Sequence, residues 1–414
     1  MRSIIVSDFA AVNGGAAKVA IESARGLAEA GVEIVFVAAI GPVAEALIHP
    51  NIRVEMIEAA EVWSVKNPIR AAAQGVWNQA AADKLLAIAA RERGRDTVIH
   101  LHQWTKAFSP AAIGAAAQSG LPTMITMHDY FSFCPEGAYF DFKAGRACDR
   151  QPMSAACMTA NCDRKSYAHK LVRVARQWRS DRALADARNL TFIHVTDFAR
   201  RFAEPHLPRD ARHATVENMM EAAQRPPVDP SRNGPVLFLG RFTVEKAPHL
   251  LAQAAAVANV PVRFIGEGPM REAIKAANPA AEILPWVPAD KVFDAMAEGR
   301  ALALPSLWFE PGPLVIAEAR SLGLPTILAR TTGPASWIRD GEDGILVEPG
   351  DVDQLAQALK SLQDNAFAQR MGRAAYDSYW RDPLTTQRHV AKTIALYETA
   401  QDWMMKPAPT ALAS

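Results

Sequence analysis

Two cations with a fixed spacing are the first residues in this 414-residue sequence whose types could do chemistry. Gly240-Arg241 comes directly after an apolar run at residues 236–239, and Lys246 follows five positions later. An arginine offers a planar fork of donors and a lysine a compact charge, so the pair can neutralise a leaving nucleotide diphosphate without a metal ion. On spacing alone, two solvated loop residues are an equally good interpretation.

Two glutamates eight positions apart follow, in the segment Glu310-Pro-Gly-Pro-Leu-Val-Ile-Ala-Glu318. On one continuous helix they would lie ~12 Å apart along the axis, too far for the carboxyl pair of a retaining glycosidase. A helix that starts near Pro313 instead leaves Glu310 in the preceding loop, because proline is favoured at the first helical position. The N–H groups of Leu314 and Val315 then point at an anion, and the carboxylates accept hydrogen bonds from sugar hydroxyls.

All the cysteines fall within one 29-residue stretch, with the spacing Cys-x13-Cys-x8-Cys-x4-Cys. In a reducing cytosol such a cluster is more often a metal site or a set of free thiols than a pair of disulfides. The spacing lacks the tight Cys-x2-Cys pairs of common zinc folds, so zinc, free thiols and disulfides all stay open, and any metal here would be structural. The four residues are Cys134, Cys148, Cys157 and Cys162.

A basic segment runs from Arg164 to Arg188, with eight Lys or Arg against two acidic residues. Leu171, Val174 and Trp178 recur in it at helical spacing. Such a helix can lie on an anionic membrane or steer a phosphate-linked lipid acceptor. The alternative is a solvated amphipathic helix that packs its apolar stripe on the domain.

Short apolar runs alternate with stretches of helical spacing, which predicts parallel sheets with helices on both faces. This alternation of predicted strands and helices stops at residues 221–235, which contain four prolines, and resumes after them. We therefore expect two α/β domains. The predicted strands are 3–7, 33–38, 53–57, 97–101, 122–127, 189–195 and 213–217, then 236–239, 262–265, 282–285, 301–304, 325–329 and 344–347. The helices predicted individually are 16–30, 248–258, 270–276, 314–322, 353–362 and 383–403.

Composition excludes several classes of protein. Half the residues are hydrophobic and 21% are charged, as in soluble globular proteins. The net charge of +1 gives no global attraction to nucleic acid, and no aromatic-interleaved basic stripe indicates base recognition. No apolar stretch of 18 residues exists, and residues 1–8 lack the features of a signal peptide. We expect a cytoplasmic protein, with the inner face of the membrane as a candidate contact through the basic segment.

Ordered motifs in both halves resemble the retaining GT-B glycosyltransferases of glycosyltransferase family four. Glu-x7-Glu alone is a weak signal, whereas several ordered motifs in the right halves are a strong one. The resemblance covers most of the chain. The motifs are Gly-Arg-x4-Lys, Phe264-Ile-Gly-Glu-Gly-Pro269 and Pro-Ser-x3-Glu-x7-Glu, preceded by Gly14-Gly15, His128-Asp129 and Val195-Thr196 with Asn218.

The resemblance implies a role for each matching residue. Arg241 and Lys246 would hold the donor diphosphate, and Glu310 would face hydroxyls of the donor sugar. Glu318 would bind the nucleotide ribose, and His128 would line the sugar pocket near the reacting carbon. These residues, Glu318 excepted, form the predicted catalytic set. The remaining donor-binding residues are Gly14, Gly15, Gly266, Gly268, Trp286, Val287, Gly312, Leu314 and Val315, together with Glu318.

Two positions depart from the family pattern. At three others, a purely structural role is an alternative to the functional one. Gly312-Pro313 replaces the more usual aromatic-glycine pair, and Ser336 stands where a glutamate is frequent; we interpret both as tuning of the donor sugar. His128 taken alone would be a structural histidine, Trp286 fits domain-core packing equally well, and the glycine pair fits a simple turn before a helix.

The resemblance also implies the domain organisation. Two Rossmann-like doubly wound domains of the GT-B fold would face each other across a cleft, and the C-terminal helix would cross back to the N-terminal domain. The expected segments are an acceptor-binding domain at 1–220 with a cysteine-containing insertion at about 130–165, a linker at 221–235, a donor domain at 236–382, the helix at 383–404 and a tail at 405–414.

The function expected is transfer of a sugar, with retention, from a nucleotide-diphosphate sugar to a hydroxyl of a saccharide or lipid-linked acceptor. We expect surface polysaccharide or glycolipid assembly as the setting and no cofactor requirement beyond the candidate structural zinc. The alternatives are a sugar-nucleotide epimerase or phosphorylase on the same fold, or a degenerate partner protein. A dehydrogenase fits the sequence least well, because no Gly-x-Gly-x-x-Gly follows a strand.

Overall fold

The computed structural model describes residues 1–94, 96–187, 189–232 and 234–405. The chain divides into two compact units. The first comprises Met1–Ala138, Asp149–Met219 and the C-terminal segment from Thr386; the second comprises Tyr139–Cys148 and Met220–Thr385. Arg188, Asn233 and residues 406–414 lie outside the described residues, and with them the end of the basic segment, one linker position and nearly all of the predicted tail.

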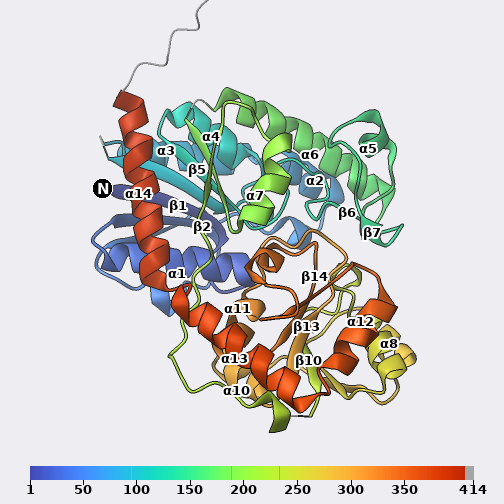
Figure 1. Ribbon diagram of the computed structural model, residues 1–414. Coiled ribbons are helices and arrows are strands. Elements are labelled where there is room, and N and C mark those ends of the chain that lie inside the picture. The colour runs from blue at the N-terminus through green and yellow to red at the C-terminus, as the bar shows by residue number, and fades with distance from the viewer. Residues whose placement is uncertain (95, 188, 233, 406–414) are drawn as a thin grey trace, which may run out of the picture. The chain divides into compact units, whose positions relative to one another are not determined.

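A seven-stranded sheet forms the centre of the first unit, and all its strands are parallel (Figure 1). The central strands are buried runs of Ile, Val and Phe, as parallel strands covered on both faces require. The strand order runs β3 (Ile52–Met56), β2 (Glu33–Ile40), β1 (Arg2–Phe9), β4 (Thr97–Gln103), β5 (Thr123–Met127), β8 (Leu190–His194) and β9 (Arg212–Thr215).

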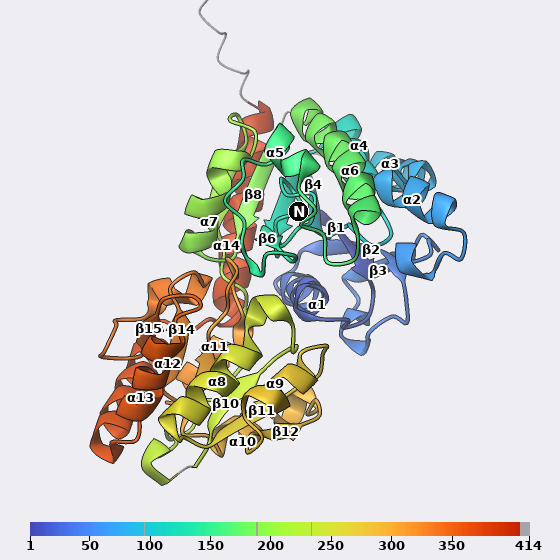
Figure 2. The same cartoon turned by 90° about the vertical axis from the view of Figure 1, so that its right-hand side faces the viewer.

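Helices cover both faces of this sheet. On one face α1 packs with α14, and on the other α3 packs with α4, which in turn contacts α6 (Figures 1 and 2). The helices are α1 (Gly15–Glu29), α2 (Pro68–Val76), α3 (Gln79–Arg91), α4 (Ala111–Ser119), α5 (Ala155–Thr159), α6 (Tyr167–Asp186), α7 (Asp197–Ala203) and α14 (Thr386–Met405), with 3-10 turns η1 (Glu45–Leu47), η2 (Val62–Ser64) and η3 (Glu204–His206).

The C-terminal helix belongs to the first unit, as the sequence predicts. Val390, Tyr397 and Ala400 on α14 are buried in one apolar cluster with residues of α1, β1 and β2. The Tyr397 hydroxyl accepts a hydrogen bond from Ser3 on β1 at 3.1 Å. The helix is therefore an integral part of the first core.

Six parallel strands form the sheet of the second unit. Three of them coincide with the predicted runs to the residue, because short, mainly apolar stretches with Gly or Pro close to their ends leave little freedom for the strand bounds. The order is β12 (Glu282–Leu284), β11 (Val262–Ile265), β10 (Val236–Leu239), β13 (Ala301–Leu304), β14 (Thr326–Ala329) and β15 (Ile345–Val347); the hairpin β6 (Phe140–Asp141) and β7 (Arg146–Ala147) also groups with this unit.

The second unit includes two helices that the sequence does not predict individually, at residues 292–297 and 365–381. Residues 365–381 form the 17-residue helix α13, which packs on α11. On the sheet, α8 contacts both α9 and α12 (Figure 2). The helices are α8 (Pro248–Ala258), α9 (Arg271–Ala277), α10 (Val292–Ala297), α11 (Leu314–Ser321), α12 (Val352–Ser361) and α13 (Asn365–Arg381), with 3-10 turns η4 (Pro230–Arg232), η5 (Val244–Lys246), η6 (Ala289–Lys291) and η7 (Gly333–Trp337).

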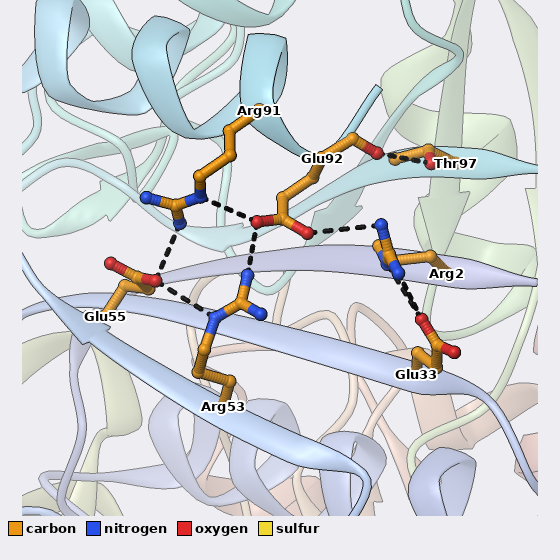
Figure 3. A network of polar contacts seen from close by, with 7 residues as sticks. All are labelled: Arg2, Glu33, Arg53, Glu55, Arg91, Glu92 and Thr97. Carbon is orange, nitrogen blue, oxygen red and sulfur yellow. Dashed lines mark hydrogen bonds and ion pairs between the residues drawn. The ribbon is translucent and has the colours of Figure 1, made fainter. Parts of the chain in front are cut away.

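Charged side chains form a network at the amino-terminal edge of the first sheet (Figure 3). The buried carboxylate of Glu92 contacts Arg91 at 2.8 Å, Arg2 at 3.2 Å and Arg53. Burial alone would raise the pKa of Glu92, but hydrogen bonding and attraction from the three guanidinium groups hold it below its ordinary value. The network ties the starts of β1 and β3 to the end of α3.

No helix in the described parts of the chain is both long enough and apolar enough to span a bilayer.

Candidate active site

The carboxyl end of β10 carries the first predicted donor ligands of the second unit. Gly240 follows the strand with a φ of 155°, a conformation that favours glycine, and leads into Arg241. Arg241 is exposed and makes no ion pair with another residue of the described chain. Lys246 closes the short turn η5, and its side chain is only 13% exposed. One cation is thus open to solvent and the other is largely covered.

Lys246 and Glu310 form an ion pair. The Nζ atom of Lys246 contacts Oε1 of Glu310, whose other oxygen accepts a hydrogen bond from the Ser306 hydroxyl at 2.7 Å. The backbone oxygen of Glu310 accepts from the N–H of Gly333 at 2.7 Å. The structure therefore brings together two predicted catalytic residues that lie 64 positions apart in the sequence.

Gly266 and Gly268 both adopt positive φ angles, of 143° and 151°. A Cβ atom on Gly266 would lie 2.1 Å from the carbonyl oxygen of Gly240, and one on Gly268 would lie 2.4 Å from that of Phe242. Neither overlap can be relieved by a side-chain movement, because the neighbouring atoms are backbone. The packing of the loop itself thus demands both glycines, and their approach to a nucleotide stays a prediction.

The helix α11 begins at Leu314, where the predicted helix 314–322 starts, and Pro313 is not its first helical residue. Pro313 is the N-cap residue with φ −70° and ψ 119°, so its extended backbone lies outside the helix. The first helical N–H groups therefore belong to Leu314 and Val315, which are half-buried together with Gly312. Glu318 lies one turn further on and is also half-buried. The arrangement keeps the predicted donors at the helix start despite the missing N–H of proline.

Trp286 and Val287 follow the end of β12. The Trp286 side chain is 51% exposed, so it does not pack in the domain core. Val287 packs against that core instead. A contact between Trp286 and a nucleotide base therefore stays a prediction, whereas the core-packing alternative is wrong for the tryptophan.

In the first unit, the glycine pair stands at the start of α1. Gly14 is the N-cap residue with φ 118°, and Gly15 opens the helix. Among the described residues nothing lies within 4 Å of a Cβ atom placed on either glycine. No side chain caps this helix, so its first N–H groups are left for solvent or a ligand.

His128 follows β5 at the same edge of the first sheet. Its Nε2 atom lies 3.2 Å from Nδ1 of His102. Burial lowers the pKa of His128 to about 4, with a smaller contribution from the charge of His389. Burial also raises the pKa of the adjacent Asp129 to about 6, although the backbone N–H of Phe131 donates to its carboxylate at 3.1 Å. His128 is therefore a neutral imidazole at neutral pH.

Sequence reasoning did not single out His100 and His102, which extend this site into the core. Their rings lie 4.1 Å apart on one face of β4. His100 contacts the hydroxyl groups of Tyr397 and Thr126, both at 2.7 Å, and burial lowers its pKa to about 3. The signal in the sequence is the His-x-His repeat at the end of an apolar strand, because alternate strand residues share a face.

No disulfide joins any two of the four cysteines in the structure, which contradicts the disulfide alternative. Cys148 belongs to the second unit and the other three belong to the first. Within the described ranges, no three or more His, Cys, Asp or Glu side chains are grouped so that they could hold a metal ion. Among the described residues, the structure does not bring together a set of ligands for the predicted zinc ion. Zinc binding by Cys134, Cys148, Cys157 and Cys162 therefore stays a prediction.

The basic segment forms α6, but this helix buries several polar side chains and exposes apolar ones, the reverse of an ordinary amphipathic helix. Its polar residues Lys170, Arg176 and Gln177 are buried. The apolar Leu171 and Trp178 are 50% and 60% exposed. The expectation that the apolar stripe packs on the domain is therefore wrong for these two residues.

Solved structures of known proteins share the fold of this chain. Sucrose-phosphate synthase from Thermosynechococcus elongatus has 16% sequence identity and a TM-score of 0.70, over 98% of this chain and 100% of that one. Anabaena Alr3699/HepE, in complex with UDP-glucose, has 16% identity and a TM-score of 0.64, over 96% and 100%. With two parallel α/β domains, the chain has the GT-B fold.

Two family models match separate halves of the chain. Glycosyltransferase Family 4 matches residues 13–218, and Glycosyl transferases group 1 matches residues 234–365. The chain belongs to this glycosyltransferase family, as the motifs indicate.

Curated relatives match over part of their length. The sulfoquinovosyl transferase SQD2 of Arabidopsis thaliana is 31% identical over 39% of this chain and 34% of its own. The lipopolysaccharide core biosynthesis glycosyltransferase LpsE of Rhizobium meliloti is 26% identical over 38% and 48%. The matched segments thus span no more than about half of these relatives.

Proposed function

We propose that this protein is a retaining glycosyltransferase that moves a sugar from a nucleotide-diphosphate sugar to an acceptor hydroxyl. Family membership supports the reaction class, and the motif resemblance supports retention. The relatives that act on sulfoquinovose and lipopolysaccharide core favour surface polysaccharide or glycolipid assembly as the setting.

The observation that carries the proposal is the cation arrangement at the carboxyl edge of the second sheet. Arg241 is exposed and Lys246 is held by Glu310 beside Ser306. A diphosphate that approaches Arg241 would meet Lys246 as the next positive group along the same loop. Arg241 then supplies the charge that attracts the donor, and Lys246 the charge that is already oriented when the leaving group forms.

The reaction breaks the bond between the anomeric carbon and the diphosphate oxygen. The sugar gains oxocarbenium character while the diphosphate leaves as an anion, which Arg241, Lys246 and the N–H groups of Leu314 and Val315 stabilise. The acceptor oxygen attacks the face from which the diphosphate departs, and its proton passes to the leaving group. Because the two cations neutralise the diphosphate, the proposal requires no metal ion for this step.

Glu310 has a positioning and binding role in this scheme. A carboxylate with one oxygen on Lys246 and one on Ser306 has its orientation fixed from both sides. Its remaining lone pairs would accept hydrogen bonds from donor-sugar hydroxyls. Glu318 would do the same for the ribose. Neither residue exchanges a proton with the substrate.

His128 would donate a neutral hydrogen bond to the donor sugar. A pKa of about 4 keeps its ring uncharged at neutral pH, so it adds no positive charge beside a developing oxocarbenium ion. His102 contacts Nε2, which leaves Nδ1 as the atom that would face the sugar.

The acceptor is proposed to be lipid-linked and to reach the enzyme at the cytoplasmic face of a membrane. The support is the outward stripe of α6, where Leu171 and Trp178 are exposed next to the exposed Arg182. Trp178→Asp should reduce co-sedimentation with anionic vesicles, whereas Trp286→Asp, at a similarly exposed tryptophan of the second unit, should not. Equal sedimentation of both variants would contradict this part of the proposal.

A thermal-shift screen against UDP, GDP, ADP, CMP and dTDP tests the main proposal. A ligand at about 100 times its dissociation constant adds ~2.7 kcal/mol to the folded state, a shift that is easily measured. One diphosphate should stabilise the wild-type chain and fail to stabilise Arg241→Ala. The complex of Anabaena Alr3699/HepE makes UDP the first candidate. Stabilisation by no nucleotide would favour a degenerate partner protein, and turnover of the donor without an acceptor sugar would favour an epimerase or phosphorylase.

A further inference from the structure

Two histidine side chains meet at the carboxyl edge of the first sheet. The strands β4 and β5 are adjacent and parallel, so His102, near the end of β4, and His128, directly after β5, lie at the same edge. Nδ1 of His102 lies 3.2 Å from Nε2 of His128, and the two ring planes are inclined by 25°. Two neutral imidazoles at this distance share one hydrogen atom, so one ring donates it and the other accepts it.

The register of the sheet shifts at His102. Val6 of β1 lies opposite Leu101 of β4, whereas the next residue, Ser7, lies opposite Gln103. The register therefore passes over His102, as it does over the extra residue of a β-bulge. Bulges re-aim side chains and are frequent next to active sites. This irregularity favours a role for His102 at the site in addition to packing.

Both rings of the pair are neutral at neutral pH. Burial lowers the pKa of His128 to about 4 and holds the pKa of His102 well below its ordinary value, with smaller contributions from neighbouring histidine charges. A neutral imidazole carries a hydrogen on one nitrogen and a bare lone pair on the other. The hydrogen between the two rings can therefore belong to either of them, and the surroundings of the second nitrogen of each ring determine which one holds it.

The second nitrogen of His102 distinguishes the two arrangements. Its Nε2 atom is fully buried and has no hydrogen-bond partner in the described ranges of the chain. If His128 donated, the hydrogen of His102 would be on this Nε2 atom, inside the protein and without an acceptor. If His102 donates from Nδ1 instead, only a lone pair is buried there. An unused buried lone pair is tolerated more often than a buried N–H without an acceptor, so the second arrangement is favoured.

We propose that His102 is a positioning residue that holds His128 in the tautomer with its hydrogen on Nδ1. His102 donates from its own Nδ1 to the bare Nε2 atom of His128. His128 is half-buried, and its Nδ1 atom makes no hydrogen bond with a described residue. That N–H can therefore donate to an oxygen of the donor sugar, whereas the opposite tautomer would offer the sugar a lone pair. The inference rests on the proposed transferase function for the identity of this ligand.

Nuclear magnetic resonance of the full-length protein with ¹⁵N-labelled histidine tests the hydrogen positions. Two-bond ¹H–¹⁵N correlations distinguish a protonated ring nitrogen from a bare one. The signals of His128 and His102 are assigned by their loss in His128→Asn and His102→Phe. The wild-type chain should carry the hydrogen on Nδ1 in both rings.

The variant His102→Phe removes the donor and keeps a planar ring. Without a hydrogen donated to Nε2, the fraction of His128 with its own hydrogen on Nε2 should rise. The kcat/KM for sugar transfer should then fall about tenfold, because one hydrogen bond to the donor sugar is weakened. The matched control is His100→Gln, at a buried histidine of the same strand whose ring nitrogens contact Tyr397 and Thr126. It should leave the tautomer of His128 unchanged.

Three outcomes would overturn the proposal: a wild-type His128 with its hydrogen on Nε2, an unchanged tautomer in His102→Phe, or an unchanged kcat/KM despite a changed tautomer. If His102→Phe does not fold, His102→Leu replaces it, and the wild-type spectrum by itself still tests the hydrogen positions. The spectra need no donor, so a wrong tautomer is distinguished from a failure of the proposed function, which the thermal-shift screen reports separately.

Discussion

The carboxyl-terminal edges of the two sheets differ in the chemistry they present. The edge of the second sheet carries charges, with Arg241 in solvent and Lys246 paired to Glu310. The edge of the first sheet carries imidazoles whose pKa values are lowered by burial, to about 4 for His128 and about 3 for His100. Two sheets of the same architecture thus supply fixed charge in one case and neutral hydrogen-bonding groups in the other.

This difference shows that a parallel α/β sheet does not determine the electrostatics of its own edge. In the second sheet, the loops at this edge hold Arg241 in solvent and the largely covered Lys246 and Glu310 as an ion pair. In the first, the histidines lie on or directly after buried strands, where an imidazolium ion would have to be desolvated. At these edges a side chain is charged where it reaches solvent or contacts an opposite charge, and neutral where burial desolvates it.

The largest expected effect concerns activity. Arg241→Ala and Lys246→Ala should each lower kcat/KM by about 100- to 1,000-fold, because each removes a charge from the leaving diphosphate. His128→Asn keeps a hydrogen-bond donor and should lose less. The rates are measured with the sugar nucleotide that the thermal-shift screen identifies. Equal losses in all three variants would contradict the assignment of charge stabilisation to the second sheet.

Stability should separate the two cations. Lys246→Met leaves the carboxylate of Glu310 buried without its partner and should lower the free energy of unfolding by about 3 kcal/mol. Arg241→Met, at an exposed residue, should change it by less than about 0.5 kcal/mol. The double variant Lys246→Met/Glu310→Gln should recover most of the loss, as measured by urea unfolding. A double variant as unstable as the single one would mean that the ion pair is not the cause.

The glycines of the two edges should respond differently to a methyl group. Gly268→Ala forces Cβ against the backbone of Phe242 and should cost at least about 2 kcal/mol, measured as unfolding free energy. Gly14→Ala has the positive φ but open space around it, so about 1 kcal/mol is expected. Equal costs would show that backbone strain, and not the packing against Phe242, dominates in both.

The stability of the first unit should fall with acid more steeply than that of the second. The unfolded state takes up the proton on His100 near pH 6.5, but the folded state binds it only near its pKa of about 3. The contribution of the buried neutral His100 to the free energy of unfolding is therefore complete above pH 6.5. It is lost as the pH falls from 6.5 toward the folded-state pKa of about 3. At 1.36 kcal/mol per pKa unit, the step from pH 7 to pH 5 should cost about 2 kcal/mol.

The variant His100→Gln isolates this contribution. The difference between its urea-unfolding free energies at pH 7 and pH 5 should be smaller than that of the wild type by the same amount. An identical pH dependence would mean that His100 is protonated in the folded protein.

The smallest expected effect is at Trp286. Trp286→Ala should raise KM for the nucleotide sugar several-fold, by loss of stacking on the base. The free energy of unfolding should not change measurably, because half of the side chain is already in solvent. A large loss of stability would place Trp286 in the domain core after all.

Sequence patterns predict the second sheet well because its strands are short apolar runs bounded by breakers. They do not predict α13 individually, for a physical reason. Its buried face mixes Met371, Tyr376 and Tyr379 with the small Ala368, Gly372 and Ala375, and the small side chains interrupt the apolar pattern. The helix forms because these residues let it approach the turn after α11, where Gly372 lies against the carbonyl oxygen of Gly323.

The sequence predicts which residue types belong to the candidate site. It does not predict which of their side chains contact one another. Arg241, Lys246 and Glu310 are recognisable from their motifs. The ion pair between Lys246 and Glu310 is not, because only the order of β10 and β13 in the sheet brings their loops together. The role of His102 depends likewise on the adjacency of β4 and β5, and the outward stripe of α6 on the polar partners beneath it.

The helix α14 belongs to the first unit but is synthesised last. The first unit can therefore be completed only after the second, although its synthesis starts earlier. The first unit begins to emerge from the ribosome early, but α1 and β1 must wait for Val390 and Tyr397, which follow the whole second unit in the chain. Residues 220–385 have all their strands before α14 is made. The nascent first sheet therefore carries an uncovered apolar strip throughout translation of the second, and a chaperone would find its binding surface there.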